Sequence, residues 1–296
     1  MTLKRILLTA LVAAALAGAA AFLFWQEKPA QPSRPLAKLK PSDLARIELD
    51  YDFAHVALTR AAGRWRLTAP VEDEADANSA DTLAQGLLDL ALGSEVSRDP
   101  SGYADYELNE SSAVRVRVYT QSSAAPVLDG YVGKAAMGSA AYFRFNRDAA
   151  VYLAESIGPN LRQRGADDFR NKALLAMSVG ELESLRFVKT RNGGFTLTRS
   201  SGAWAAAGRK LTAEKAAEIV LAVTSLRFTE FAPADTPPQN TGLDKPVVDL
   251  VVGGEGRSER ILIGREDAGR RYAKVAGRKA VGFVSKYDVD SLLKLL

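Results

Sequence analysis

The densest run of chemically capable side chains in this sequence is acidic: Glu72-Asp73-Glu74-Ala75-Asp76. Several carboxylate oxygens close together are the ligands that Ca²⁺ prefers in proteins. The run lacks the alternating spacing and the glycine of a calcium-binding loop, and it stands just before a predicted helix. Negative charge stabilises a helix N-terminus, so we interpret the run as the beginning of a helix and predict no metal site.

Other motifs with possible chemistry are explained more simply by structure. His55 is the only histidine, and we expect it on the solvent side of a strand. Gly253-Gly254-Glu255-Gly256 resembles a phosphate-binding loop in composition, but no lysine–serine pair follows it. A strand is predicted next in place of a helix, so this segment is predicted to be a hairpin turn.

The chain has no cysteine and no Gly-x-Ser-x-Gly pattern around a serine nucleophile. We therefore predict a protein that is not an enzyme and that uses no cofactor. A hydrolase with paired carboxylates is a less favoured alternative, because the 35 acidic residues allow many pairs in space.

A cluster of charges near the middle of the chain is the strongest candidate for binding a partner. It contains Asp167, Asp168, Arg170 and Lys172. We interpret it as a charged surface around a helical connector between two halves, with Arg170 and Lys172 contacting the partner. Because exposed charges change stability by less than about 0.5 kcal/mol, exchanging these two residues for glutamate is expected to leave the fold intact.

Composition and charge exclude several classes of protein. Of the 296 residues, 47% are hydrophobic and 25% are charged, which is typical of globular proteins. Residues 1–41 carry seven charges that sum to +5, so a total of +4 leaves −1 for residues 42–296. Proteins that bind nucleic acid keep their positive charge on the folded body, so we exclude a nucleic-acid partner.

The N-terminus has the composition of a membrane segment. Residues 6–25 carry no charge, and a helix of this length spans about 30 Å, the thickness of a bilayer core. Small residues at 19–21 would also suit cleavage of a signal peptide, but the apolar run continues beyond them. We predict an uncleaved single-pass anchor in residues 1–28. The prolines that follow predict a stiff linker over residues 29–45.

The orientation of the anchor is less clearly encoded. Four basic residues soon after the apolar run outnumber the two before it, which favours a cytoplasmic body. A short basic head before an apolar run is nevertheless the usual export signal, and the charge rule weakens when a long domain follows. We therefore expect a bacterial inner-membrane protein whose body lies in the periplasm, on the outer face.

The body of the chain contains an internal repeat. Residues 58–65 (LTRAAGRW) return as residues 197–204 (LTRSSGAW), with Leu, Thr, Arg, Gly and Trp in register. We take Gly63, Gly202, Trp65 and Trp204 as markers of the repeat. The two tryptophans are expected to be equivalent and largely buried.

The segments that follow each tryptophan recur in the same order. Helices are expected over residues 76–92, capped by Asp76 or Asn78, and over residues 211–226, capped by Thr212. Alternating strands follow each helix. The spacing predicts an α+β fold, in which a transmembrane helix precedes two tandem repeats of antiparallel sheet plus one main helix. Repeat unit 1 is expected over residues 46–165 and repeat unit 2 over residues 166–296.

Five features together resemble a known bacterial family, domain of unknown function 4340. They are the N-terminal membrane segment, the LTR-x-x-G-x-W-x-L-T-A-P motif at 58–70, the acid and helix beginning at Asp76, FRNKALL at 169–175 and TGLDKP at 241–246. The first half departs from the last motif at residues 106–108, which read Tyr-Glu-Leu.

The resemblance implies an envelope protein, and members of the family are often associated with ABC-type exporters related to gliding motility. The expected role is thus an accessory or scaffold subunit, with the inner membrane and an ABC-type permease or associated envelope protein as partners. The alternative is a periplasmic module that binds a glycan, peptide or lipid. Such a module would show an exposed aromatic groove, for which the available residues are Tyr103, Tyr106, Tyr119, Tyr131 and Tyr142.

Overall fold

The structure is a computed structural model that describes residues 33–157, 159–190 and 192–296. The predicted membrane anchor and the first residues of the predicted linker lie outside these ranges. The prediction of a stiff linker is wrong for the rest of it, because Ser33 pairs with Leu92, Leu36 is buried and a strand begins at Leu44. Within them, no helix combines the length and the apolar character that a membrane crossing requires.

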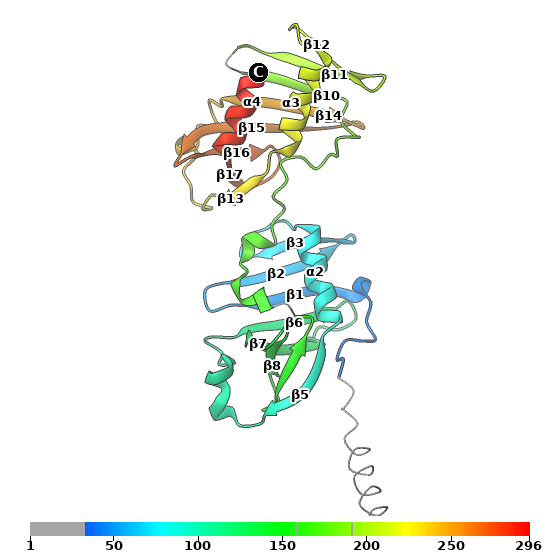
Figure 1. Cartoon of the computed structure of the whole chain (residues 1–296), viewed down its shortest axis with the longest axis vertical. Coiled ribbons are helices and arrows are strands. Elements are labelled where there is room, and N and C mark those ends of the chain that lie inside the picture. Colours follow the sequence, from blue (N-terminus) through cyan, green and yellow to red (C-terminus); the bar gives the residue numbers. More distant parts are fainter. Residues whose placement is uncertain (1–32, 158, 191) are drawn as a thin grey trace, which may run out of the picture. The chain divides into compact units, whose positions relative to one another are not determined.

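Two sheets of antiparallel strands make up most of the fold (Figure 1). The nine strands of the first sheet are β1 (Leu44–Asp50), β2 (His55–Ala61), β3 (Arg64–Ala69), β4 (Asp73–Glu74), β5 (Ala91–Ser97), β6 (Val114–Thr120), β7 (Leu128–Ala135), β8 (Ala141–Phe145) and β9 (Val151–Glu155). The eight strands of the second sheet are β10 (Ser184–Lys189), β11 (Phe195–Ser200), β12 (Ala203–Ala207), β13 (Phe228–Phe231), β14 (Val248–Gly254), β15 (Arg257–Asp267), β16 (Arg270–Val275) and β17 (Val281–Ser285).

Strand order is the same in the two sheets. The first sheet runs β3-β2-β1-β6-β7-β8-β9-β5, and the second runs β12-β11-β10-β14-β15-β16-β17-β13. The first sheet has one further strand, β4, which pairs with the outer edge of β3. The mostly antiparallel architecture that the strand spacing predicts is therefore present.

The helices begin at polar caps that the sequence identifies. They are α2 (Ala77–Leu88), α3 (Ala213–Ser225) and α4 (Lys286–Leu295). The Asp76 carboxylate accepts a hydrogen bond from the Ser79 amide, and the Thr212 hydroxyl accepts one from the Lys215 amide. Both caps are among those predicted. Short 3₁₀ helices, which the sequence did not predict, cover Pro41–Asp43, Pro100–Tyr106, Pro159–Gln163, Ala166–Asp168 and Pro238–Asn240.

The first predicted helix is too long. We expected it to reach residue 92, but α2 ends at Leu88 and β5 begins at Ala91. Apolar residues continue from Leu87 to Leu92 with only the exposed Asp89 among them, so the apolar stripe of the helix leads into the buried start of β5. Apolar periodicity alone does not separate a helix from a short buried strand.

A two-residue turn closes both hairpins that carry the repeat markers. Ala62 and Gly63 have φ values of 48° and 78°, and Ser201 and Gly202 have values of 50° and 84°. Two positive φ angles in succession define a type I′ turn, whose twist matches that of the flanking strands. The turn predicted at 253–256 is confirmed as well, since β14 pairs with β15 across Glu255 and Gly256.

We predict that Gly63→Ala and Gly202→Ala each lower the free energy of unfolding by about 1–2 kcal/mol, because a side chain opposes positive φ. A β-carbon at either glycine would have nothing within 4 Å, so the cost is conformational and should be similar at both sites. Chemical denaturation of the two variants measures it. A difference of more than about 1 kcal/mol between them would show that the turns are not equivalent.

The first half lacks the glycine of the TGLDKP motif, but its backbone has the same left-handed conformation at the corresponding residue. Gly242 has φ 66°, and Glu107 has a left-handed φ of 54° at the end of the corresponding 3₁₀ helix. An ion pair to Arg162 holds the Glu107 side chain. An αL conformation is thus kept without glycine, at a cost that a tertiary contact offsets.

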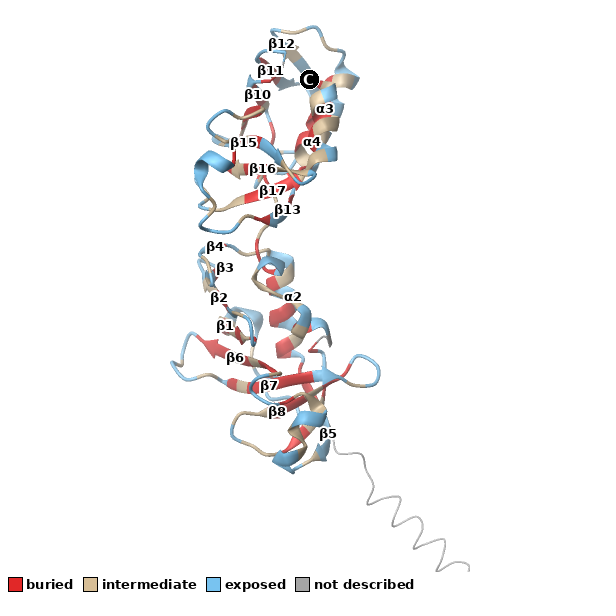
Figure 2. Ribbon diagram, turned by 90° about the vertical axis from the view of Figure 1, so that its left-hand side faces the viewer, coloured by how far each residue is buried: buried red, intermediate tan, exposed pale blue. Residues whose placement is uncertain are grey.

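The chain divides into two compact units with interleaved segments. One comprises residues 33–43 and 83–162, and the other comprises residues 44–82 and 163–296, as far as these ranges are described. In the second unit, α3 and α4 lie side by side over one face of the second sheet (Figures 1 and 2). Buried side chains from β10, β11, β14 and β15 meet those of the two helices there and form one apolar core.

Candidate partner-binding site

The predicted helical connector is mostly extended. Only Ala166–Asp168 is helical, as a single 3₁₀ turn. Arg170 then forms an antiparallel bridge with Ala75, and Ala173 forms one with Arg227. The chain between these bridges adds further backbone hydrogen bonds, from the Asn171 amide to the Glu74 carbonyl and from the Phe228 amide to the Lys172 carbonyl. The connector is extended because neighbouring segments satisfy its backbone groups.

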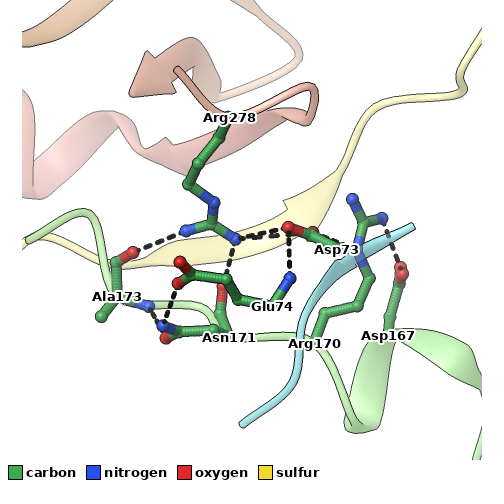
Figure 3. A network of polar contacts seen from close by, with 7 residues as sticks. All are labelled: Asp73, Glu74, Asp167, Arg170, Asn171, Ala173 and Arg278. Atoms are coloured by element: carbon green, nitrogen blue, oxygen red, sulfur yellow. Dashed lines mark hydrogen bonds and ion pairs between the residues drawn. The ribbon is translucent and has the colours of Figure 1, made fainter. Parts of the chain in front are cut away.

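A buried ionic network surrounds the connector (Figure 3). Arg170 Nε donates to Asp73 Oδ2 at 2.9 Å, and Arg278 Nη2 donates to Asp73 Oδ1 at 3.2 Å. The exposed fractions of the three side chains are 10% for Arg170, 12% for Arg278 and 5% for Asp73. Arg170 Nη1 also donates to Asp167 Oδ1. One carboxylate thus serves two guanidinium groups in a low-dielectric environment.

The expectation that Arg170 is exposed is wrong. Its guanidinium lies over the Phe231 ring, 3.4 Å from the ring centroid, and pairs with Asp73. A planar guanidinium that stacks on an aromatic ring and binds a carboxylate suits a buried position far better than lysine would. The sequence shows a charge at this position but not its distant partner.

Arg278 is a structural residue that sequence reasoning missed. Besides Asp73, it donates to the Ala173 and Asn171 carbonyl oxygens at 2.9 and 2.8 Å. It is 205 residues from Asp73 in the chain. No local pattern distinguishes it from other arginines, so only the fold reveals its role.

Each acid of the run at 72–76 has a protein partner. Asp76 caps α2, which confirms that the run stands just before a helix, although Asp73 and Glu74 themselves form the short strand β4. Glu74 Oε2 accepts a hydrogen bond from the Asn171 side chain. Glu72 is exposed and accepts one from Lys279, which together with the positive charge of that lysine lowers the pKa of the glutamate.

A basic pocket lies beside the network. It has a volume of about 350 Å³ and is lined by Asp76, Ser79, Arg164, Asp168, Arg170, Lys172 and Arg227. All seven residues belong to the second compact unit. Lys172 is half-buried and Arg227 is exposed. Neither side chain forms an ion pair with any other described residue.

The acids of the basic pocket are held by hydrogen bonds within the protein. Asp76 Oδ1 accepts from the Ser79 amide, and Asp168 Oδ2 accepts from the Gly165 amide at 2.7 Å. Arg164 stacks over Phe169, with its guanidinium carbon 4.0 Å from the ring centroid. The pocket therefore presents unpaired cations at Lys172 and Arg227, while its carboxylates are already engaged.

Tyr51 is electrostatically coupled to this pocket. Burial raises the pKa of its hydroxyl far above the usual range, and the charge of Asp168 raises that pKa further. The charge of Arg164 opposes both effects without cancelling them. Tyr51 therefore stays protonated and adds no negative charge to the basic pocket.

The two marker tryptophans are in register but differ in burial. Trp65 lies opposite Arg60 on β2, and Trp204 lies opposite Arg199 on β11. Trp65 is 5% exposed, and its Nε1 donates to Asp81 at 2.9 Å. Trp204 is only half-buried, although it packs against the core of the second sheet. Neither ring is mostly in solvent, as expected, but Trp204 is buried to a smaller extent than Trp65.

The remaining candidates are explained by packing. His55 is exposed, as predicted, and its Nδ1 lies 2.6 Å from Asp50 Oδ1. Of the five tyrosines considered for an aromatic groove, Tyr119 and Tyr131 are buried. The other three, Tyr103, Tyr106 and Tyr142, are half-buried. They pack against a small buried cluster made of Leu108, Ala113, Tyr131 and Val151.

Comparison with known proteins identifies one relationship. The model of a family described as "Domain of unknown function (DUF4340)" matches residues 65–246. The matched range includes the connector and every residue that lines the basic pocket. No curated protein and no solved structure matches the chain.

Proposed function

The chain belongs to the DUF4340 family, and from this premise we propose that it is a membrane-anchored, non-catalytic envelope protein. In this proposal it serves as an accessory or scaffold subunit of an ABC-type export system, which it contacts through the basic pocket. The uncharged run at 6–25 would anchor it in the inner membrane.

The observation that carries the proposal is the charge state of the basic pocket. Arg164, Lys172 and Arg227 line it, while its two acids are engaged in backbone hydrogen bonds. Carboxylates held in this way are poorly placed to move protons in a reaction. Unpaired cations around a cavity are suited to an acidic segment of a partner protein, because complementary charge speeds and orients association.

The shared strand order of the two sheets supports the finer proposal of an internal duplication. We propose that residues 46–165 and 166–296 descend from one ancestral unit. The connector then lies where the two proposed repeats meet in the sequence. Lys172 belongs to this connector and remains the candidate partner contact, in contrast to Arg170.

We predict that Lys172→Glu with Arg227→Glu reduces recovery of the partner about tenfold in a pull-down of the full chain from solubilised membranes, because reversal removes the attraction to an acidic segment. The expected partner is an ABC permease or its associated envelope subunit. Lys245→Glu with Lys294→Glu is the matched control, since both lysines are exposed and lie outside the basic pocket. Equal recovery with both double variants would refute docking at the pocket.

We also predict the topology. Alkaline phosphatase fused after Leu296 should be active, and green fluorescent protein at the same position should be dark, because only an exported body folds the first and disables the second. The short basic head before the apolar run motivates this expectation. A fluorescent fusion would instead support the count of basic residues that favours a cytoplasmic body.

A further inference from the structure

The strand at one side of the second sheet has an open edge. Among the described strands, none pairs with the outer edge of β12. Its counterpart by strand order, β3, is covered there by β4, which places Glu74 opposite Arg66 and Asp73 opposite Leu67. The second sheet therefore lacks one strand at the position where the first sheet has its shortest one.

The two tryptophans on these strands differ in burial. Trp65 and Trp204 occupy matching register positions, each opposite an arginine of the preceding strand. Trp65 lies on a covered strand and is 5% exposed, whereas Trp204 lies on the open strand and is half-buried.

The composition of β12 leaves its edge unprotected. The strand reads Ala203-Trp204-Ala205-Ala206-Ala207 and contains neither charge nor proline. Soluble proteins usually protect open edges with lysine, proline or a bulge, because an uncharged edge readily pairs with another strand. The nearest cations in the sequence after the strand are Arg209 and Lys210.

The pairing pattern of β12 defines which backbone groups face outward. Ser200 and Ala203 pair directly across the two-residue turn. The backbone groups of Ala203 and Ala205 therefore point towards β11, and those of Trp204 and Ala206 point to the open edge. A new antiparallel partner would bond to Trp204 and Ala206.

We infer that β12 pairs antiparallel with β12 of a second copy of this chain, with the two Ala205 residues directly opposite each other. In this register, Trp204 lies opposite Ala206 of the second copy, so a large side chain meets a small one on the core side of both sheets. The two outward-facing residues of each copy exchange backbone hydrogen bonds. The result is one continuous sheet through two molecules.

Electrostatics favour a second copy as the occupant. The five residues of β12 bring no like charges together when the strand pairs with itself. Arg209 and Lys210 lie beyond the end of β12, after Gly208 with its φ of 85°, and therefore take no part in this pairing. Five residues from each copy form an interface below the standard size of about 1,600 Å², so the dimer should be weak and reversible. The inference does not depend on the proposed function.

Cysteine cross-linking tests the register directly, because the chain contains no cysteine of its own. In the full chain, Ala205→Cys should form a disulfide-linked dimer under mild oxidation, since the two positions are directly opposite. Thr198→Cys is the control: Thr198 is exposed and pairs with Ala205 one strand further in. Two such positions would be about 14 Å apart, three strand spacings, which is too far for a disulfide.

Cross-linking and self-association each give a result that would support the inference and one that would overturn it. Ala205→Cys should give about tenfold more covalent dimer than Thr198→Cys, given the distance limit of a disulfide. Ala205→Lys, which places like charges opposite each other, should weaken self-association about tenfold in sedimentation equilibrium, while Thr198→Lys should not. Unchanged thermal unfolding would establish that the lysine variants are folded. Equal cross-linking of the two cysteine variants, or unchanged association of Ala205→Lys, would overturn the inference.

Discussion

Replacing Arg170 with methionine is expected to lower the free energy of unfolding by about 3–5 kcal/mol, the range for removing one partner of a buried ion pair. The side chains of Arg170 and Asp73 are 10% and 5% exposed, so the carboxylate would lose a hydrogen-bonding partner that water cannot easily replace. The contact with the Phe231 ring would also change. Urea unfolding of the purified protein measures the loss.

A matched pair of variants separates burial from charge. Lys279→Ala removes the partner of Glu72, an ion pair in which both side chains are exposed. We expect it to leave the unfolding midpoint essentially unchanged, because solvent screens such pairs. Combining Arg170→Met with Asp73→Ala should cost less than the sum of the two single changes, since the residues share one interaction. Additive losses, or a loss below about 1 kcal/mol for Arg170→Met, would mean that the network is not buried as described.

Trp65→Ala is the second change with a large expected effect. It should cost about 3–5 kcal/mol, because it opens a large cavity in a packed region. It also removes the hydrogen bond from Trp65 Nε1 to Asp81. Trp204→Ala should cost only about 1–2 kcal/mol, since a half-exposed ring loses less apolar burial. Denaturant unfolding of the two variants under the same conditions gives the comparison.

The Phe variants divide the effect at the first site further. Trp65→Phe keeps an aromatic ring and loses the donor to Asp81, so it should cost about 1–2 kcal/mol. Trp204→Phe has no such bond to lose among those present in the described residues, so a smaller change is expected. Equal losses for Trp65→Ala and Trp204→Ala would contradict the difference in burial.

Local sequence patterns predicted the elements of this fold well. Asp76 and Thr212 mark the beginnings of α2 and α3 because a side-chain oxygen can satisfy a free amide there. The glycines of residues 253–256 mark a hairpin, because the turn there requires positive φ at Glu255 and Gly256. These signals involve only a few neighbouring residues, so they can be recognised without knowledge of the tertiary structure.

Local patterns do not predict contacts between residues that are distant in the sequence. Arg170 looks like a surface charge in sequence, and only the approach of Asp73 and Phe231 makes it a buried residue. Trp65 and Trp204 likewise stand in nearly identical local sequences, yet Trp65 is 5% exposed and donates to Asp81 of α2 whereas Trp204 is half-buried. Such differences arise from which segments meet in space, and two nearly identical local sequences can therefore have different surroundings.

The buried network has a consequence for the synthesis of the chain. Asp73 emerges from the ribosome 97 residues before Arg170 and 205 residues before Arg278. At translation rates of about 5–20 residues per second, Asp73 waits roughly 10–40 s for its second arginine. During that time burial of the Asp73 carboxylate is unfavourable, because one of its two cationic partners is absent. The segment that carries Asp73 therefore does not pack in its final position. The ionic network around Asp73 can therefore form in full only when the polypeptide is nearly complete. A nascent chain stalled before Arg278 would lack the complete network, and proteases and chaperones would recognise it as incompletely folded.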